Sequence, residues 1–387
     1  MKKNPGFTLQ YLEGTPFLLP FGQSVAEQRR GVRLDEAGVF LWHALDRADS
    51  CDELLRLYRD YQRPLPEEED ALRQGLDSFL TMLRAYRILP EDRPLRRAAG
   101  RCYRIAGLRL RLTDWPEFIP AELDAFTSDD TGPVDLSVEI TPTEAPVGRP
   151  AELVLRSEDL QLWKADGYWL LDFPRYRALD CVELSEDGRF SRFHIRPVFS
   201  PKSGELLREE LFHALRHCFL YLAQRRGLLA LHAASVLYRG RAWLFSAPAG
   251  TGKSTHAKLW QEQFGVPQLN GDLALLAPDG QGGFTMCGFP WCGTSGIWTK
   301  EDVPLGGVIL LRRGAENRIE EPAAAFRQLF VANRLISPAW TEEMLESNLR
   351  FSGSVCKAAP VLRLYCRPDS KAAAVCRAAV DRTMEGR

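Results

Sequence analysis

The chain has 387 residues, a length that predicts two or three domains of about 150 residues each. Hydrophobic residues make up 45% and charged residues 26%, as in ordinary globular proteins. The 50 basic and 51 acidic residues leave a net charge of -1, which argues against a protein whose main partner is nucleic acid. With neither a secretory signal nor an apolar run of membrane-spanning length, the nine cysteines indicate reduced thiols, and we expect a cytoplasmic protein without a membrane partner.

Residues 1–95 are expected to form one small unit that opens with a β-hairpin. Strands are predicted at 7–12 and 16–19, because both runs are apolar and flank a turn at Gly14. A third short strand is expected at 31–34.

Three helices are expected to follow in this unit, each with its own start signal. Asp35 is the N-cap candidate for the first helix, and Ser50 opens the second. Pro66 and the glutamates after it start the third, since proline and acidic residues favour the first turn. The apolar positions of the third helix are Leu72, Leu76, Phe79, Leu80, Leu83 and Tyr86.

Residues 91–100 have the composition of a linker. The region 96–204 reads as β-rich, and we assign it to no family. Short alternating segments predict strands at 134–140, 151–155, 161–163, 168–171 and 192–195. An amphipathic helix is expected over 204–226.

From 205 to 387 strand and helix patterns alternate, which predicts an α/β layer arrangement. A buried strand at 242–246 leads through a glycine-rich turn into a helix at 253–264, and the next strand covers 273–276. Further strands are expected at 307–311 and 361–366, and further helices at 323–335, 342–349 and 371–382.

The glycine-rich turn at 247–254 has the residues of a phosphate-binding loop. Its glycines let backbone N–H groups approach phosphate oxygens, and the helix that follows adds its positive dipole end. A lysine then neutralises the charge of the β- and γ-phosphates, and a hydroxyl helps to hold Mg²⁺. We therefore expect ATP as the ligand. Ala247 stands where the full pattern has glycine, which is tolerable if its φ is negative. The nucleotide-binding residues are predicted to be Ala249, Gly250, Thr251, Gly252, Lys253, Ser254 and Thr255.

Two side chains outside the loop are candidates for the chemistry. Asp272 enters the strand after the loop helix, where an acid can hold Mg²⁺ together with Ser254. Its alternative is a plain turn aspartate after Asn270-Gly271. His232 lies among apolar residues upstream of the loop strand, where a core histidine and a functional one both remain open.

A further stretch and three arginines each allow two interpretations. The stretch 288–296 is either an active-site loop or a structural turn. Arg312, Arg313 and Arg334 could each stabilise phosphate charge, with a solvated basic face as the alternative.

The remaining histidines and the close cysteine pair give weaker signals. His213 and His217 are four residues apart on a helix, but incidental surface histidines explain the spacing better than a metal site. His256 on the loop helix could face either way. Cys287 and Cys292 are interpreted as structural or incidental thiols.

Residues 205–385 resemble the HPr serine kinase family, a branch of the P-loop group shared with ATP-type phosphoenolpyruvate carboxykinases. The matching stretches are Leu231-His232-Ala233, 245–255, Asn270-Gly271-Asp272 and 288–296. The family has a histidine near the active site one strand before the loop, which corresponds to His232. It also has an Asp-Asp pair after the loop helix, of which only Asp272 is present because Gly271 occupies the first position.

This resemblance implies an α/β P-loop domain of HPr kinase type over 205–387. In the family one acid serves the metal and the other is the base toward the serine hydroxyl. With Gly271 in the first position, the base is left open between Asp272 and His232. The implied catalytic residues are therefore Asp272, His232 and Lys253, and the implied metal residues are Ser254 and Asp272.

Residues 1–95 resemble a PqqD-like domain, the winged-helix-like peptide-binding module of ribosomal-peptide modification systems. The hairpin, the stretch 32–42 and two further helices ending at Leu89 carry this resemblance. In that family a leader peptide adds as a strand to the sheet edge.

Three functional hypotheses follow. The first is an ATP-dependent kinase that phosphorylates a serine or threonine hydroxyl of a ribosomally made peptide captured by residues 1–95. The second is a small-molecule kinase, and the third is a catalytically weak nucleotide-sensing protein. We expect no nucleic-acid partner, and homo-oligomerisation is left open.

Overall fold

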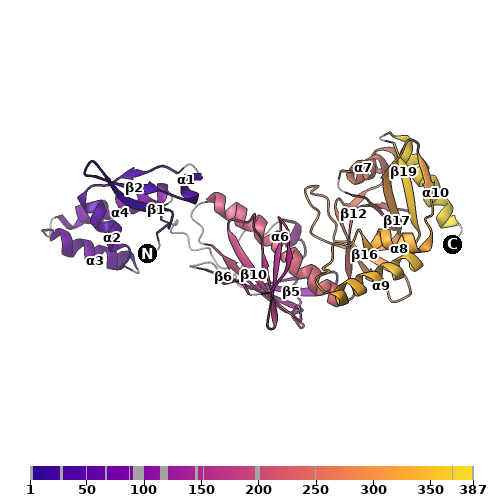
Figure 1. Ribbon diagram of the computed structural model, residues 1–387, viewed down its shortest axis with the longest axis horizontal. Coiled ribbons are helices and arrows are strands. Elements are labelled where there is room, and N and C mark those ends of the chain that lie inside the picture. Colours follow the sequence, from indigo (N-terminus) through magenta and orange to yellow (C-terminus); the bar gives the residue numbers. More distant parts are fainter. Residues whose placement is uncertain are drawn as a thin grey trace. The chain divides into compact units, whose positions relative to one another are not determined.

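The computed structural model describes residues 3–26, 29–48, 50–65, 68–86, 88–89, 100–113, 121–143, 147–150, 152–196, 201–248, 250–367 and 369–385. Two compact units emerge: Met1–Arg96 with Pro142–Glu144 and Arg196–Leu207, and the rest of the chain. The protein is a mixed α/β protein with several sheets (Figure 1). The predicted boundary between 96–204 and 205–387 falls within Arg196–Leu207, a segment grouped with the first unit, and it stays a prediction.

The first unit contains a small antiparallel sheet with the order β1-β2-β3. Its strands are β1 (Phe7–Leu12), β2 (Thr15–Pro20) and β3 (Val32–Arg33). Glu13 and Gly14 join β1 to β2 with φ values of 50° and 79°, the left-handed pair that suits a two-residue hairpin. The predicted hairpin and third strand are confirmed, and β1 and β3 are the two edges.

The helices of this unit are α1 (Gln23–Ala26), α2 (Glu36–Ala44), α3 (Cys51–Gln62) and α4 (Glu69–Ala85). The Asp35 side chain accepts from the Gly38 N–H at 2.7 Å, and Ser50 accepts from the Glu53 N–H at 3.2 Å, so both predicted caps are confirmed. The start signal at 66–67 lies outside the described residues. The five buried apolar positions predicted in α4 join the core of the unit, whereas Tyr86 is exposed.

The second unit begins with an eight-stranded sheet, in the order β4-β5-β6-β11-β10-β9-β8-β7. Its strands are β4 (Arg101–Ile105), β5 (Leu108–Thr113), β6 (Leu136–Pro142), β7 (Glu152–Arg156), β8 (Gln161–Ala165), β9 (Tyr168–Asp172), β10 (Leu179–Ser185) and β11 (Phe190–Ile195). The short helix α5 (Ala121–Asp124) lies between β5 and β6 in the chain. Each strand expected in this region overlaps an observed one. Strands β4, β5 and β10 were not predicted, and residues 91–99 of the expected linker lie outside the described residues.

The long helix α6 (Pro201–Arg225) packs against this sheet through polar contacts as well as apolar ones. The Glu210 carboxylate accepts three backbone N–H groups at 2.8 Å, from Arg177, Ala178 and Leu179. The Trp169 Nε1–H donates to the Tyr221 hydroxyl at 3.0 Å. These contacts hold α6 between the β-rich sheet and the strands that follow.

The second sheet of this unit has the order β13-β12-β15-β16-β17-β19-β18, with β13 also paired to β17 and β14 to β12. Its strands are β12 (Leu229–Tyr238), β13 (Arg241–Ser246), β14 (Gln268–Asn270), β15 (Leu273–Pro278), β16 (Phe284–Cys287), β17 (Val303–Arg313), β18 (Arg318–Glu320) and β19 (Val361–Cys366). Strands β13, β17 and β19 run parallel, so their carboxyl ends lie at one edge of the sheet.

Helices cover both faces of this sheet, in accord with the predicted layers (Figure 1). They are α7 (Lys253–Phe264), α8 (Ala324–Ala332), α9 (Glu342–Ala358) and α10 (Lys371–Glu385). Trp260 of α7 and Cys376 of α10 pack with Phe245 in one apolar core. Val331 of α8 and Phe351 of α9 belong to the other core.

Among the described residues, no helix combines the length and apolar character that a membrane crossing requires.

Candidate functional site

The loop between β13 and α7 adopts backbone conformations that require its glycines. Gly250 has a φ of 71° and Gly252 a φ of 108°, both in the region that favours glycine. Ala247 is not among the residues with positive φ, and its side chain is buried in the core under α7. Alanine is therefore compatible with the backbone at this position, where the full phosphate-loop pattern has glycine. Ala249 lies outside the described residues.

The N-terminus of α7 has no side-chain cap. Its N-cap residue is Gly252, and no side chain accepts from the first N–H groups of the helix. Ser254 and Thr255, in this first turn, are exposed. The first N–H groups of an α-helix have no acceptor within the helix, so those of α7 can bind an anion.

Lys253 is the first residue of α7 and is buried, with 8% of its surface exposed. Its amine has no hydrogen bond or ion pair within the described part of the chain. Burial lowers the pKa of Lys253, the Asp272 carboxylate opposes that shift, and the nearby Arg334 adds to it. A buried cation without a hydrogen-bonded partner favours binding of a phosphate oxygen.

Asp272 and His232 form a hydrogen-bonded pair beside this lysine. His232 Nε2 lies 3.0 Å from Asp272 Oδ1, and each side chain is 30% exposed. The hydrogen bond to His232 lowers the pKa of Asp272, and the charges of Lys253 and Arg216 act in the same direction. The structure thus brings together the three residues proposed for catalysis, whose roles stay predictions.

Asn270 fixes the backbone that carries Asp272. Its Oδ1 accepts the N–H groups of Asp272 at 3.0 Å and Leu273 at 2.9 Å. Its Nδ2 donates to the carbonyls of Phe289 at 3.3 Å and Trp291 at 3.2 Å. A buried amide with all these partners orients Asp272 and joins it to the 288–296 stretch, a role that the sequence did not reveal.

Gly271, which stands where the family has its first aspartate, has no room for a side chain. A Cβ atom there would lie 2.1 Å from the Ser295 hydroxyl oxygen and 2.4 Å from Ser295 Cβ. The Ser295 hydroxyl in turn donates to the Cys292 carbonyl at 2.6 Å. Serine 295 therefore fills the space that an acid at 271 would need.

The stretch 288–296 is partly a structural turn and partly a wall of the site. Phe289 and Trp291 are each 1% exposed, and Trp291 Nε1 donates to the Phe212 carbonyl at 2.8 Å. At the other end, a Cβ added to Gly293 would lie 2.8 Å from Asp272 Oδ2. The stretch is thus packed as a structural turn at one end and lies close to Asp272 at the other, and its role in an active site stays a prediction.

The candidate arginines have different environments. Arg313 Nη2 donates to the Gly250 carbonyl at 2.8 Å and so holds the loop itself. Arg312 and Arg334 line a neighbouring cavity. Arg216 on α6 was missed, although its charge favours the ionised Asp272. It lies 56 positions upstream on an amphipathic helix, where no motif marks it.

Among the other candidate histidines, His256 is buried, whereas His213 and His217 are partly exposed. Trp260 Nε1 donates to His256 Nε2 at 3.2 Å, and burial lowers the pKa of His256 to about 4. Burial lowers the pKa of His217 to about 3, and its ring lies 5.5 Å from that of Phe173. His217 is partly exposed, and its interpretation as an incidental histidine stays a prediction. Burial also lowers the pKa of His213.

The nine cysteines are free thiols, and Cys287 and Cys292 are buried. Within the described ranges, no group of three or more histidine, cysteine, aspartate or glutamate side chains could hold a metal ion.

No protein-family model and no curated protein matches this chain. Among solved structures, the HPr(Ser) kinase/phosphatase from Coxiella burnetii matches 40% of this chain and 98% of its own length, with 10% sequence identity and a TM-score of 0.25. The chain is thus similar in part to an HPr(Ser) kinase/phosphatase. This TM-score and identity do not assign a function, so the functional argument rests on the residues of the site.

Proposed function

We propose that this chain is an ATP-dependent kinase of HPr kinase type, which transfers the γ-phosphoryl group of ATP to a serine or threonine hydroxyl of a peptide. One observation carries the proposal. The buried Lys253 begins an uncapped helix after a glycine-rich loop, beside the carboxylate of Asp272 that His232 hydrogen-bonds. A protein catalyses phosphoryl transfer mainly by positioning the reactants and by stabilising the charge on the transferring group.

The donor groups suit a triphosphate with Mg²⁺. The N–H groups of the first turn of α7 and the Lys253 amine would hold the phosphates. Ser254 and Asp272 offer hard oxygen ligands, since Asp272 Oδ1 faces His232 and the second oxygen remains for a cation. Magnesium takes few protein ligands and completes its shell with phosphate and water, where it neutralises charge on the transferring group.

The Asp272–His232 pair is the candidate acceptor base. A histidine held by a carboxylate is oriented for proton transfer, and a carboxylate near an accepting hydroxyl can take the proton directly. The proton would pass from the acceptor hydroxyl to one of these two groups as the oxygen attacks the γ-phosphorus.

The first unit offers two sheet edges where a peptide could add as a strand. Strand β1 provides a six-residue edge, and β3 provides a two-residue edge. Large apolar side chains are exposed on this unit, including Tyr11 at 59%, Phe21 at 49% and Val25 at 56%. A captured precursor would reach the kinase site at a raised effective concentration.

Radiolabel transfer tests the proposed reaction. Peptides encoded beside this gene would be incubated with the chain, Mg²⁺ and γ-³²P-labelled ATP, and the product analysed by mass spectrometry. A phosphoserine or phosphothreonine on one peptide is the expected result. ATP turnover without a labelled peptide or small molecule would refute kinase action.

Proline substitutions test peptide capture, because they remove a backbone N–H from an edge. Tyr11→Pro acts on β1 and Arg33→Pro on β3, with Tyr11→Ser and Arg33→Ala as matched controls. Loss of peptide binding in one proline variant alone would identify the edge. If neither changes transfer to the peptide, capture at a sheet edge is wrong, and a small-molecule kinase becomes the better account.

The filled space at Gly271 favours one alternative, a nucleotide-sensing protein with weak or absent catalysis. Tight ATP binding in Mg²⁺ with neither turnover nor transfer would support it. The free state of all nine cysteines suits a reducing compartment, so we propose that the chain acts in the cytoplasm.

A further inference from the structure

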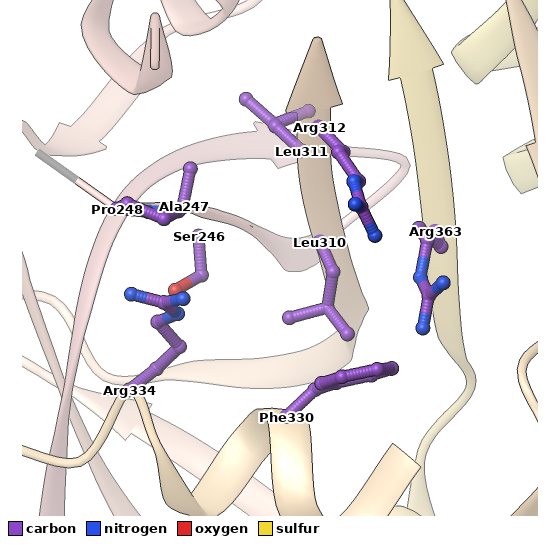
Figure 2. Close-up of a pocket in the computed structure, with 9 residues that line it drawn as sticks. All are labelled: Ser246, Ala247, Pro248, Leu310, Leu311, Arg312, Phe330, Arg334 and Arg363. Atoms are coloured by element: carbon purple, nitrogen blue, oxygen red, sulfur yellow. The ribbon is translucent and has the colours of Figure 1, made fainter. Parts of the chain in front are cut away.

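A cavity of about 220 Å³ lies at the carboxyl ends of the parallel strands, next to the start of the phosphate loop. Its walls include Ser246 of β13, Leu310 and Arg312 of β17, and Arg363 of β19. Phe330 of α8 and Arg334, which follows α8, also line it. Figure 2 shows Leu310 between Arg334 on one side and Arg363 on the other, with Phe330 below. In open α/β sheets, this end of the strands is where ligands bind.

The charge of this cavity is positive and poorly compensated. The side chains of Arg312 and Arg334 have no ion pair or hydrogen bond among the residues that the structure describes. Arg363 has Glu320 at 3.6 Å, but the same carboxylate also pairs with Arg318. Among the described residues, no acidic side chain lines the cavity.

Two of the three arginines, Arg334 and Arg363, are partly buried, whereas Arg312 is exposed. Only 15% of the Arg363 side chain is exposed, and its guanidinium lies 4.2 Å from the centre of the Phe330 ring. Arg334 is close enough to Lys253 to lower the pKa of that lysine. Its backbone carbonyl accepts the His232 N–H at 2.8 Å, which fixes the segment beside the catalytic pair.

We propose that this cavity is a second oxyanion site, which binds a phosphate or carboxylate group while the loop holds the nucleotide. Guanidinium groups bind these planar or tetrahedral oxyanions through paired N–H donors, and the apolar walls strengthen the attraction. The cavity is smaller than the pockets that enclose whole drug-sized ligands, so it suits one anionic group. Ala247 and Pro248, at the start of the loop, line the cavity, whereas Lys253, Gly250 and Gly252 do not.

The bound oxyanion could be free phosphate or an anionic group that the acceptor carries. Guanidinium groups would bind either of them in the same way. Simultaneous occupancy rests on the proposed nucleotide binding at the loop. The oxyanion site itself does not rest on it, because its arginines can be tested without nucleotide.

Calorimetry on the full chain tests the site with inorganic phosphate as the probe, with and without saturating Mg²⁺ and a non-hydrolysable ATP analogue. We expect phosphate to bind in both states. Arg312→Gln should weaken phosphate binding about tenfold or more, because it removes charge-assisted hydrogen bonds. Arg350→Gln, which removes the same charge from an exposed position on α9, is the matched control and should change it little.

O-phosphoserine serves as the second probe, to separate the two sources. Tighter binding than free phosphate indicates a group carried by a larger acceptor, and weaker binding indicates free phosphate. If the analogue excludes phosphate, the cavity serves the nucleotide itself and the proposal is overturned. It is equally overturned if phosphate does not bind or if Arg312→Gln behaves like Arg350→Gln. Loss of analogue binding alone would instead refute the proposed nucleotide site.

Discussion

The start of α3 in the first unit and the start of α7 in the second show opposite solutions to the same problem. Both helices begin with N–H groups that have no acceptor within the helix. In α3 the Ser50 hydroxyl accepts from the Glu53 N–H at 3.2 Å. In α7 the preceding residue is Gly252, no side chain caps the helix, and a buried lysine stands in the first turn.

This difference separates a helix whose first N–H groups are capped from one whose first N–H groups would be satisfied by the proposed anionic ligand. The caps at Asp35 and Ser50 stabilise the first unit without reference to a ligand. The loop before α7 leaves its donors and the Lys253 amine available, which costs stability unless an anion binds. Side chains whose hydrogen-bonding capacity the fold does not use therefore mark the functional region.

Replacement of the candidate acid should have the largest effect on the reaction. Asp272→Asn keeps the shape of the side chain but removes the charge that, in the proposed reaction, would bind Mg²⁺ and accept the proton of the hydroxyl. We expect transfer to fall about 10²- to 10³-fold, whereas ATP binding without Mg²⁺ changes little. The control is Asp279→Asn, a turn aspartate whose role is to accept N–H groups from Gln281 and Gly283 at 2.8 Å each. Equal transfer by Asp272→Asn and the unchanged chain would exclude a catalytic role.

His256 should make the phosphate-loop unit sensitive to acid. Burial lowers its pKa from 6.5 to about 4, so the unfolded chain binds a proton first as the pH falls. The stability that follows from the neutral folded form is fully present above pH 6.5 and is lost as the pH approaches about 4. This amounts to about 3 kcal/mol. His217 acts in the same direction.

His256→Leu tests this contribution. The variant leaves the Trp260 N–H without its acceptor, so we expect lower stability at neutral pH by about 1–3 kcal/mol and a shallower loss toward pH 4. Denaturant midpoints followed by tryptophan fluorescence at several pH values measure both effects. An unchanged acid slope would show that His256 titrates normally.

An acid restored at 271 should destabilise the fold unless Ser295 is also removed. Gly271→Asp forces a side chain into the space of the Ser295 hydroxyl, at a cost of about 1–3 kcal/mol. Adding Ser295→Gly should recover part of this cost. A double-mutant cycle on thermal unfolding measures the coupling, and strict additivity of the two changes would contradict the account of Gly271.

Loss of a cap in the first unit should have the smallest effect. Ser50→Ala removes the acceptor of the Glu53 N–H and should cost about 1 kcal/mol of stability in that unit. Affinity for ATP should not change, because the phosphate loop belongs to the other unit. Thermal unfolding and ATP titration of the same sample check both expectations. A large loss of ATP affinity would show that the two units are coupled.

Local signals in the sequence were sufficient for the helix starts and the loop. Asp35 and Ser50 occur as caps, and helix 253–264 and strand 361–366 have the predicted bounds. Such features depend on a few neighbouring residues, as hairpin turns and caps do. Strand 7–12 also has its predicted bounds, whereas the ends of most other elements differ from expectation because packing, and not local preference, decides them.

Contacts between distant segments could not be predicted in this way. The reason for Gly271 lies in Ser295, and the cavity joins Arg312, Arg334 and Arg363 from three separate segments. Arg216 lies on α6, where a cationic residue resembles any solvated side chain. The pairing of His256 with Trp260 four residues later is a local signal that could have been used, since such residues share a helix face.

The most direct test is the affinity for ATP and Mg²⁺ of Lys253→Ala compared with Lys258→Ala. Both lysines lie on α7, but Lys253 is buried beside Asp272, and Lys258 is exposed and pairs with Glu262 at 3.6 Å. Isothermal titration should show about a hundredfold loss for Lys253→Ala, because its charge-assisted contacts to phosphate disappear, and little change for Lys258→Ala. Equal affinities in both variants and the unchanged chain would contradict nucleotide binding at this loop.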